Sequence, residues 1–320
     1  MNIKLIVLLV TTISVLLFGP PSLKASEFDH CQPYTSVTGS CKEFSEAELN
    51  SIRASNNANL IMGAGIVNLV TDSTSSVGRE FIELANRIES PKGIATISLI
   101  AYNLDPSRNL PLKLLKEDIA KLLQADKDNA LSYYLNALLL QEEGADQKAL
   151  AQIKKGNVYK FNGYPKQRFY AIAQVAEMAK CGGRLSREHA FWNSNSAAIY
   201  LKLRHLCQKL KKEYGQEAQD ACMVMGKNLE ATSLTCLEDL FSLAIQTESL
   251  NDSPSDDVTR SEIKKRRDVA FACGARTVDI PETDVTEEVD KQYYEILLDK
   301  GEASAQKFIG DFANRKHNEN

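Results

Sequence analysis

The stretch that decides the fold is residues 126–156, DKDNALSYYLNALLLQEEGADQKALAQIKKG. A polar break over residues 126–130 leads into a helix that we expect over residues 131–143. Its apolar residues fall at helical spacing and share one broad face: they are Tyr133, Leu135, Ala137, Leu138, Leu139 and Leu140. Such a broad apolar face predicts that most of this helix is buried.

A second helix follows at once. Gly144 ends the first helix, and Asp146 is expected to cap the next one. On this second helix the apolar residues again share a face: they are Ala149, Leu150 and Ile153. Gly156 closes it. The stretch therefore predicts two short helices folded back on each other as an antiparallel hairpin.

This hairpin resembles a tetratricopeptide repeat (TPR), in which two antiparallel helices of about 34 residues stack on neighbouring units. The resemblance covers about residues 126–160. On that register Tyr133 takes the large-residue position. Ala137 and Ala149 take the small positions where the two helices approach closely, and Ala149 lies five residues after Gly144.

Two positions depart from the repeat pattern, since Gly156 stands where an alanine is usual and Asn136 where a leucine is usual. Residues 103–106 are read as the end of an earlier unit, and a helix over residues 166–179 as the start of a later one. An unrelated helical hairpin is the alternative interpretation. The resemblance implies a short solenoid of stacked hairpins that holds a peptide or protein segment in a concave groove.

Three residues are the groove candidates that this resemblance implies: Tyr133, Asn136 and Leu140. Tyr133 and Leu140 suit the core equally well. No cofactor is implied.

The rest of the chain also reads as helix after helix, because β-branched and polar residues do not alternate over any useful length. Ser45 and Glu48 have the spacing of a capping box and open the first helix. Further helices are expected over residues 59–70, 78–89, 90–103, 111–123, 186–212, 216–229, 231–246, 261–274 and 291–314. Residues 277–290 are expected to be extended, and 315–320 disordered.

The N-terminus predicts export. Lys4 precedes the apolar run Leu5–Phe18, Gly19-Pro20-Pro21 ends it, and Ala25 supplies a small residue for cleavage. The run has about 14 residues, against about 20 for a membrane-spanning helix. We therefore expect a cleaved signal peptide over residues 1–25, a periplasmic or extracellular location, and no stable membrane insertion. The style of this signal favours a bacterial source.

Charge argues against a nucleic-acid partner. The chain has a formal charge of −4, which becomes −6 when Lys4 and Lys24 leave with the signal. An acidic chain repels phosphate backbones unless a basic patch overrides the balance. The one dense basic run, residues 264–267, falls within a predicted helix and is interpreted as a solvated face.

Seven cysteines in an exported chain predict disulfides with one thiol left over. Cys31 and Cys41 bracket a short loop rich in turn-forming residues. Cys207 lies eight residues before Gly215 and Cys222 lies seven after it, so a helical hairpin turning at that glycine places the two at similar height. These four are the disulfide candidates. Of the remaining three, Cys181, Cys236 and Cys273, two are expected to pair and one to be left over.

No catalytic set is recognisable. Residues 188–192 place the one tryptophan beside a histidine and a carboxylate, but show no nucleophile and base with an orienting group. Core packing of Trp192 is the preferred interpretation. Gly63-Ala64-Gly65 lacks the third glycine of a nucleotide fingerprint, and no cysteine and histidine cluster has zinc-site spacing.

The sequence thus predicts an all-α protein with a disulfide-bearing C-terminal part. Its expected regions are a signal (1–25), a loop segment (26–44), a TPR-like region (45–182), a cysteine-bearing region (183–246), a linker (247–260), C-terminal helices (261–314) and a tail (315–320). The leading functional expectation is an exported binding or scaffold protein. The alternatives are an exported hydrolase with an unrecognised active site, for which residues 188–192 are the first candidate region, and a secreted factor that acts on a host or neighbouring cell.

Overall fold

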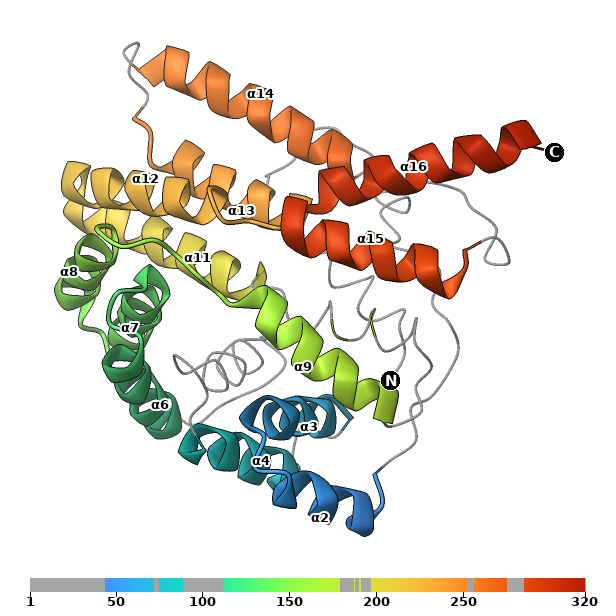
Figure 1. Ribbon diagram of the computed structural model, residues 1–320. Helices are drawn as coiled ribbons and strands as arrows, with labels where there is room; N and C mark the ends of the chain where they lie inside the picture. Colours follow the sequence, from blue (N-terminus) through green and yellow to red (C-terminus); the bar gives the residue numbers. More distant parts are fainter. Residues whose placement is uncertain are drawn as a thin grey trace.

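The structure is a computed structural model that describes residues 44–71, 75–88, 112–178, 187, 190, 197–251, 256–274 and 285–319. Within these ranges the chain forms helices and connections without a named strand, which confirms the predicted all-α class (Figure 1). The helices are α2 Glu46–Ala54, α3 Ala58–Thr71, α4 Ser76–Arg87, α6 Leu112–Ala125, α7 Ala130–Glu142, α8 Asp146–Gly156, α9 Pro165–Met178, α11 Ala197–Tyr214, α12 Gln216–Glu230, α13 Cys236–Glu248, α14 Asp257–Gly274, α15 Glu287–Lys300 and α16 Glu302–Glu319.

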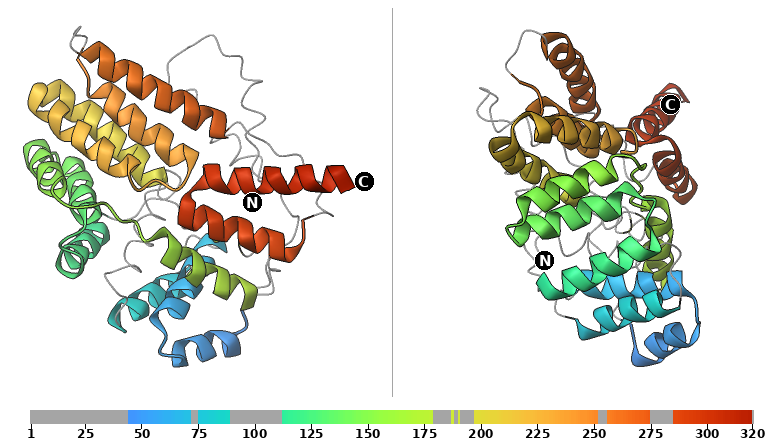
Figure 2. Two further views of the ribbon diagram at one scale, coloured as in Figure 1. Left: turned by 45° about the horizontal axis from the view of Figure 1, so that its top comes forward. Right: turned by 90° about the vertical axis from the view of Figure 1, so that its left-hand side faces the viewer.

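The helices succeed one another across the molecule. Figures 1 and 2 show α2, α3 and α4 at one end and α14 at the opposite end, with α6–α8 and α11–α13 between them. α15 and α16 lie to one side, where Tyr294 of α15 stacks on Phe169 of α9 with ring centroids 5.4 Å apart. Among the described residues, the main apolar cluster includes residues from Leu49 to Ala305, and a smaller cluster lies between α13 and α14.

At the N-terminal end, α2 begins with the predicted capping box. The Ser45 hydroxyl accepts from the Glu48 backbone N–H, and the Glu48 carboxylate accepts from the Ser45 N–H at 2.7 Å. Most of α3 between Ile61 and Leu69 is buried, as its apolar composition predicts, and the helix packs against α4 and α9.

The predicted hairpin is formed by α7 and α8. Asn129 caps α7, with its side-chain oxygen accepting from the Leu131 N–H at 3.0 Å. Gly144 adopts a φ of +72° in the turn, a conformation that favours glycine. The expectation that Asp146 caps the second helix was wrong: the cap is Ala145, which has no capping side chain, and Asp146 begins α8.

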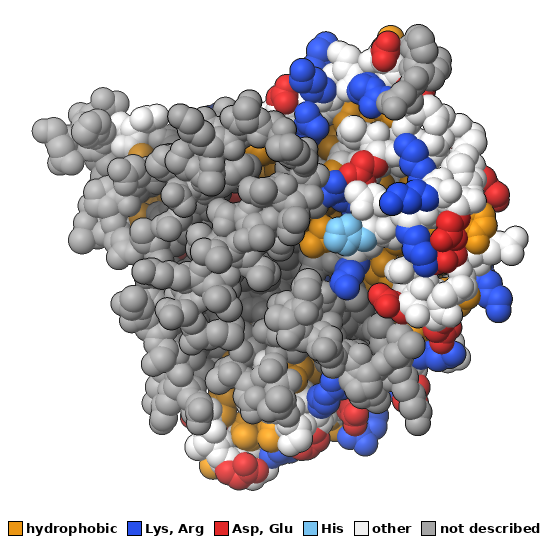
Figure 3. All heavy atoms as spheres, turned by 180° about the vertical axis from the view of Figure 1, so that it is seen from behind, with side chains coloured by type: hydrophobic (Ala, Val, Ile, Leu, Met, Phe, Trp, Pro, Cys, Tyr) orange, Lys and Arg blue, Asp and Glu red, His pale blue; other side chains and the backbone are white. Residues whose placement is uncertain are grey.

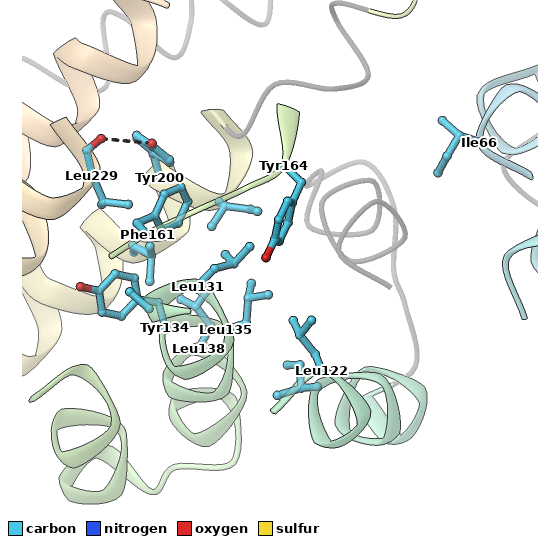
Figure 4. Packing of buried hydrophobic residues seen from close by; sticks show 14 of the residues in the cluster. Ile66, Leu122, Leu131, Tyr134, Leu135, Leu138, Phe161, Tyr164, Tyr200 and Leu229 are labelled. Carbon is cyan, nitrogen blue, oxygen red and sulfur yellow. Dashed lines mark hydrogen bonds between the residues drawn. The ribbon is translucent and has the colours of Figure 1, made fainter. Parts of the chain in front are cut away.

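A second hairpin packs on the first. α11 and α12 turn at Gly215, with α11 beside α7 and α12 beside α8. Between them lies a part of the core built of Leu131, Tyr134, Phe161, Tyr200 and Leu229 (Figure 4). The buried Tyr200 hydroxyl donates to the Leu229 carbonyl oxygen at 3.3 Å, which satisfies its polar group inside the apolar cluster.

The segment between α8 and α9 is tied to the start of α7. Asn129 donates to the Asp126 carboxylate and to the Asn162 carbonyl, both at 2.7 Å. The Tyr164 hydroxyl donates to the same carboxylate at 2.9 Å. α9 then leaves the hairpin and packs along α3, so it does not continue the α7–α8 layer as the later repeat unit would.

Several helix bounds differ from the prediction. α13 starts at Cys236 instead of Ala231, because Thr235 and Glu238 form a capping box there. α13 continues to Glu248 and α14 starts at Asp257. The connection between them is therefore shorter than the predicted linker. Residues 287–290, expected to be extended, begin α15.

The predicted last helix, 291–314, is two helices. Gly301 adopts a φ of +82° between α15 and α16, which breaks the helix because this conformation is foreign to a right-handed helix. α16 continues to Glu319, so the expectation of a disordered tail was wrong for residues 315–319.

Candidate functional site

The residues assigned to the repeat pattern, Ala137, Gly144 and Ala149, lie inside the α7–α8 hairpin or at its turn. Ala137 and Ala149 are fully buried, and Gly144 makes the turn. A Cβ at Gly156 would lie 2.7 Å from the Tyr134 ring, so close packing of the helices requires glycine there.

Of the three groove candidates, Tyr133 is a core residue. Its side chain is 6% exposed, its ring stacks on Tyr159 at 5.3 Å, and its hydroxyl donates to the Lys127 carbonyl oxygen. Leu140 is half-buried and packs against the core, and Asn136 is half-buried. These residues do not line the groove described below.

Residues 188, 189, 191 and 192, where the sequence suggested a hydrolase site, lie outside the described residues, as do Cys31, Cys41 and Cys181. Ala190 is buried. Arg187 is buried and forms an ion pair with Asp290 of α15 at 2.6 Å.

The four described cysteines form two disulfides. Cys207 and Cys222 are joined across the α11–α12 hairpin with their Cα atoms 6.0 Å apart, as the spacing about Gly215 predicts. Cys236 and Cys273 are joined between α13 and α14 with their Cα atoms 6.1 Å apart. This settles which two of the remaining three cysteines pair.

A polar groove lies where α12, the end of α13 and the start of α14 meet, and we call it the α12–α14 groove. It has a volume of about 410 Å³. One wall is a face of α12 with the residues Gln216, Gln219, Asp220, Met223 and Lys227. The other wall comes from the α13–α14 connection and the start of α14, with Ser249, Leu250, Asn251, Asp256 and Thr259.

Three amide side chains form a directed chain in this groove. Gln219 donates to the Asn251 side-chain oxygen at 2.6 Å, and Asn251 donates to the Gln216 oxygen at 2.8 Å. Gln216 donates in turn to the Asp220 carboxylate at 2.7 Å. Each of the three amides thus donates to the next group in the chain, which ends at the Asp220 carboxylate.

At the other end of this chain an acceptor is left over. The Gln219 side chain is 6% exposed, and its Oε1 atom is buried without a hydrogen-bond partner. A buried acceptor without a partner costs about 1–3 kcal/mol. The Gln219 side chain thus donates into the amide chain of the groove, while its oxygen lies buried beneath the wall.

Backbone contacts hold Asn251 in position. Its N–H donates to the Asp256 carboxylate at 3.0 Å, and its carbonyl oxygen accepts from Arg260 at 2.7 Å. Lys211 donates to the carbonyl oxygens of Glu248 and Leu250, which neutralises the C-terminal end of α13 beside the groove. The polar wall is therefore fixed from two sides.

Sequence reasoning missed this groove, although two signals for it exist. The wall residues of α12 follow the spacing i, i+3, i+4, i+7 and i+11, which is one helix face of mixed amide, acidic and basic groups. The second signal is the polar stretch from Asn251 to Asp257, which the sequence predicts as a linker and which contributes Asn251 and Asp256 to the groove.

Charged side chains on the described part of the face opposite to that of Figure 1 are of both signs and interspersed (Figure 3). In the part of the chain that the structure describes, helices long and apolar enough to cross a membrane do not occur. Comparison with protein-family models, curated proteins and solved structures finds no match for this chain. The class defined by fold and site is thus an all-α protein of packed hairpins with a polar surface groove.

Proposed function

We propose that this protein is an exported helical binding protein that holds a peptide or protein segment, and that the α12–α14 groove is where the segment binds. The observation that carries the proposal is the row of amide, acidic and basic side chains along the two walls of the groove. A peptide backbone presents N–H donors and carbonyl acceptors at regular intervals. The chain of amide side chains on the wall offers the complementary groups.

The length of the groove suits an extended segment. Eleven residues separate Gln216 from Lys227, which at about 1.5 Å per residue is roughly 16 Å of helix. An extended peptide rises about 3.3 Å per residue, so about five residues cover that distance. Met223 and Leu250 supply apolar contact between the polar ends.

The two ends differ in charge, which gives the bound segment a direction. Asp220 and Asp256 lie at one end, and Lys227 lies two helical turns from Asp220. We therefore expect segments with a basic group at the aspartate end and an acidic group about three residues away.

Export is the second part of this proposal. The charged start, apolar run and small residue of positions 1–25 support it, and so do two disulfides in the described residues, since disulfides persist outside the reducing cytosol. The TPR-like nature of the α7–α8 hairpin likewise stays a proposal. It is supported by the buried alanines and the close approach at Gly156.

An array of short synthetic peptides of defined sequence tests the groove, with the mature chain as the soluble probe. Wild type is expected to select peptides with the basic-then-acidic order. Lys227→Glu should weaken their binding by about tenfold or more, because a favourable charge contact becomes repulsive. The paired exchange Asp220→Lys with Lys227→Asp should select the reversed order.

Val224→Ala is the matched control, since Val224 is exposed on α12 but does not line the groove. It should bind as wild type does. Unchanged selectivity in both charge variants, or no peptide bound by wild type, would contradict the proposal.

A further inference from the structure

Three helix ends meet at the second disulfide. Cys236 begins α13, Cys273 lies in the last turn of α14, and Glu302 begins α16. The two sulfur atoms and a carboxylate oxygen of Glu302 all lie within 4.8 Å of one another. Both cysteines are buried, and Glu302 is half-buried.

Glu302 is fixed beside Cys236 by two hydrogen bonds of opposite direction. Its backbone N–H donates to the Leu234 carbonyl oxygen at 2.8 Å, and its carboxylate accepts from the Cys236 N–H, also at 2.8 Å. Gln306 donates to the other carboxylate oxygen at 3.2 Å. These hydrogen bonds therefore hold the carboxylate next to the two sulfur atoms.

Two further carboxylates lie near Glu302. Glu238 and Asp239 of the first turn of α13 lie close enough to repel the Glu302 carboxylate. Two thiolates added to the Glu302 carboxylate form a set of soft and hard anionic ligands, a donor set that zinc accepts in proteins.

We propose that Cys236, Cys273 and Glu302 form a zinc-type metal site once the disulfide is reduced. A dithiol donor supplies two electrons and two protons: its own sulfurs become a disulfide, and the bond between Cys236 and Cys273 becomes two thiols. Binding of Zn²⁺ then releases these two protons, and the metal is held by two thiolates and the carboxylate, with water completing a tetrahedron. This inference is independent of the peptide groove.

The geometry allows the change without moving helices. Two sulfur ligands at about 2.3 Å from a tetrahedral zinc are about 3.8 Å apart. Cα atoms 6.1 Å apart accommodate that separation by rotation of the two side chains. In the described part of the chain, the other disulfide, Cys207–Cys222, has no comparable third ligand, which makes it an internal control.

Cobalt is the probe for the test. The mature chain is reduced with a phosphine, freed of reductant without oxygen, and titrated with Co²⁺ alone. One Co²⁺ per chain is expected, with a thiolate-to-metal charge-transfer band that is absent from the oxidised protein. Zn²⁺ should displace it.

Variants assign the ligands. Cys236→Ser should abolish the band, and Glu302→Gln should weaken Co²⁺ binding by about tenfold or more. The paired Cys207→Ser and Cys222→Ser variant should keep the full site. Because Glu302→Gln retains both cysteines, it remains informative if Cys236→Ser fails to fold. The proposal is overturned by reduced wild type that binds no Co²⁺, by equal affinity in Glu302→Gln, or by loss of the band in the Cys207 and Cys222 variant.

Discussion

Tyr164 shows how one residue is held in a conformation that its side chain does not favour. Its φ of +50° lies in the left-handed region, which costs about 1–2 kcal/mol for a residue with a Cβ. Its backbone N–H donates to the Asn162 side chain at 2.8 Å, and its hydroxyl donates to Asp126. These contacts offset the strain and tie the segment before α9 to the start of α7.

Replacing Tyr164 by phenylalanine should therefore destabilise the protein. The variant keeps the ring but removes a hydrogen bond to a buried carboxylate, which costs about 1–3 kcal/mol. Urea unfolding at neutral pH measures the loss. Tyr170→Phe is the control, because Tyr170 is 45% exposed on α9, and it should change stability by less than about 0.5 kcal/mol.

The stability difference between wild type and Tyr164→Phe should depend on pH. Burial, and next the hydrogen bond to Asp126, raise the pKa of Tyr164 above its ordinary value of 10.0. As the pH rises, Tyr164 loses its proton in the unfolded chain before it does so in the folded protein. Its contribution to the free energy of unfolding is therefore complete below pH 10 and is lost as the pH rises further. The stability difference between wild type and Tyr164→Phe should narrow above pH 10. A difference that stays constant there would contradict this account.

The roles of some individual residues could be predicted from the sequence and those of others could not. The spacing of Ser45 and Glu48 alone predicts a capping box, because that motif is local. Thr235 and Glu238 carry the same signal, which was not recognised, and the start of α13 was misplaced for that reason. The hydrogen bond from Gln219 to Asn251 could not be predicted, since the two residues are 32 positions apart.

At the scale of the helices, α3 and α9 approach each other closely at Gly63. A Cβ at Gly63 would lie 2.2 Å from the carbonyl oxygen of Ala171 and 2.8 Å from Val175. A backbone oxygen cannot rotate away, so a larger residue forces the two helices apart. The glycine thus sets the distance between the N-terminal helices and α9.

Gly63→Ala should lower the free energy of unfolding by about 1–3 kcal/mol, through overpacking at this contact. Denaturant unfolding followed by circular dichroism provides the measurement. Asn59→Ala on the same helix is the matched control, because Asn59 is exposed. Equal stability of the two variants would show that α3 and α9 are not in close contact.

Helix existence was easier to predict than helix bounds. The apolar faces of α7 and α8 are visible in the sequence, because they recur with the helical period. The break between α15 and α16 was missed because the apolar period continues across Gly301, and only its positive φ divides the helix. The path of α9 toward α3 depends on packing between distant segments, which periodicity does not report.

For the whole molecule, export and disulfides are tested together by intact and peptide mass spectrometry of protein made in an exporting host. We expect loss of residues 1–25, the bonds Cys207–Cys222 and Cys236–Cys273, and a third between Cys31 and Cys41. Cys181 should be the one thiol that a label modifies. An unprocessed chain with seven labelled thiols would contradict the proposed export.

The bond between Cys236 and Cys273 also changes what a single break in the backbone does. It closes a loop of 37 positions that includes the connection between α13 and α14. A protease that cuts between Leu250 and Asp257 leaves two fragments that a covalent bond still joins. Both walls of the groove stay on one molecule, so a nicked chain keeps its parts together until a reductant separates them.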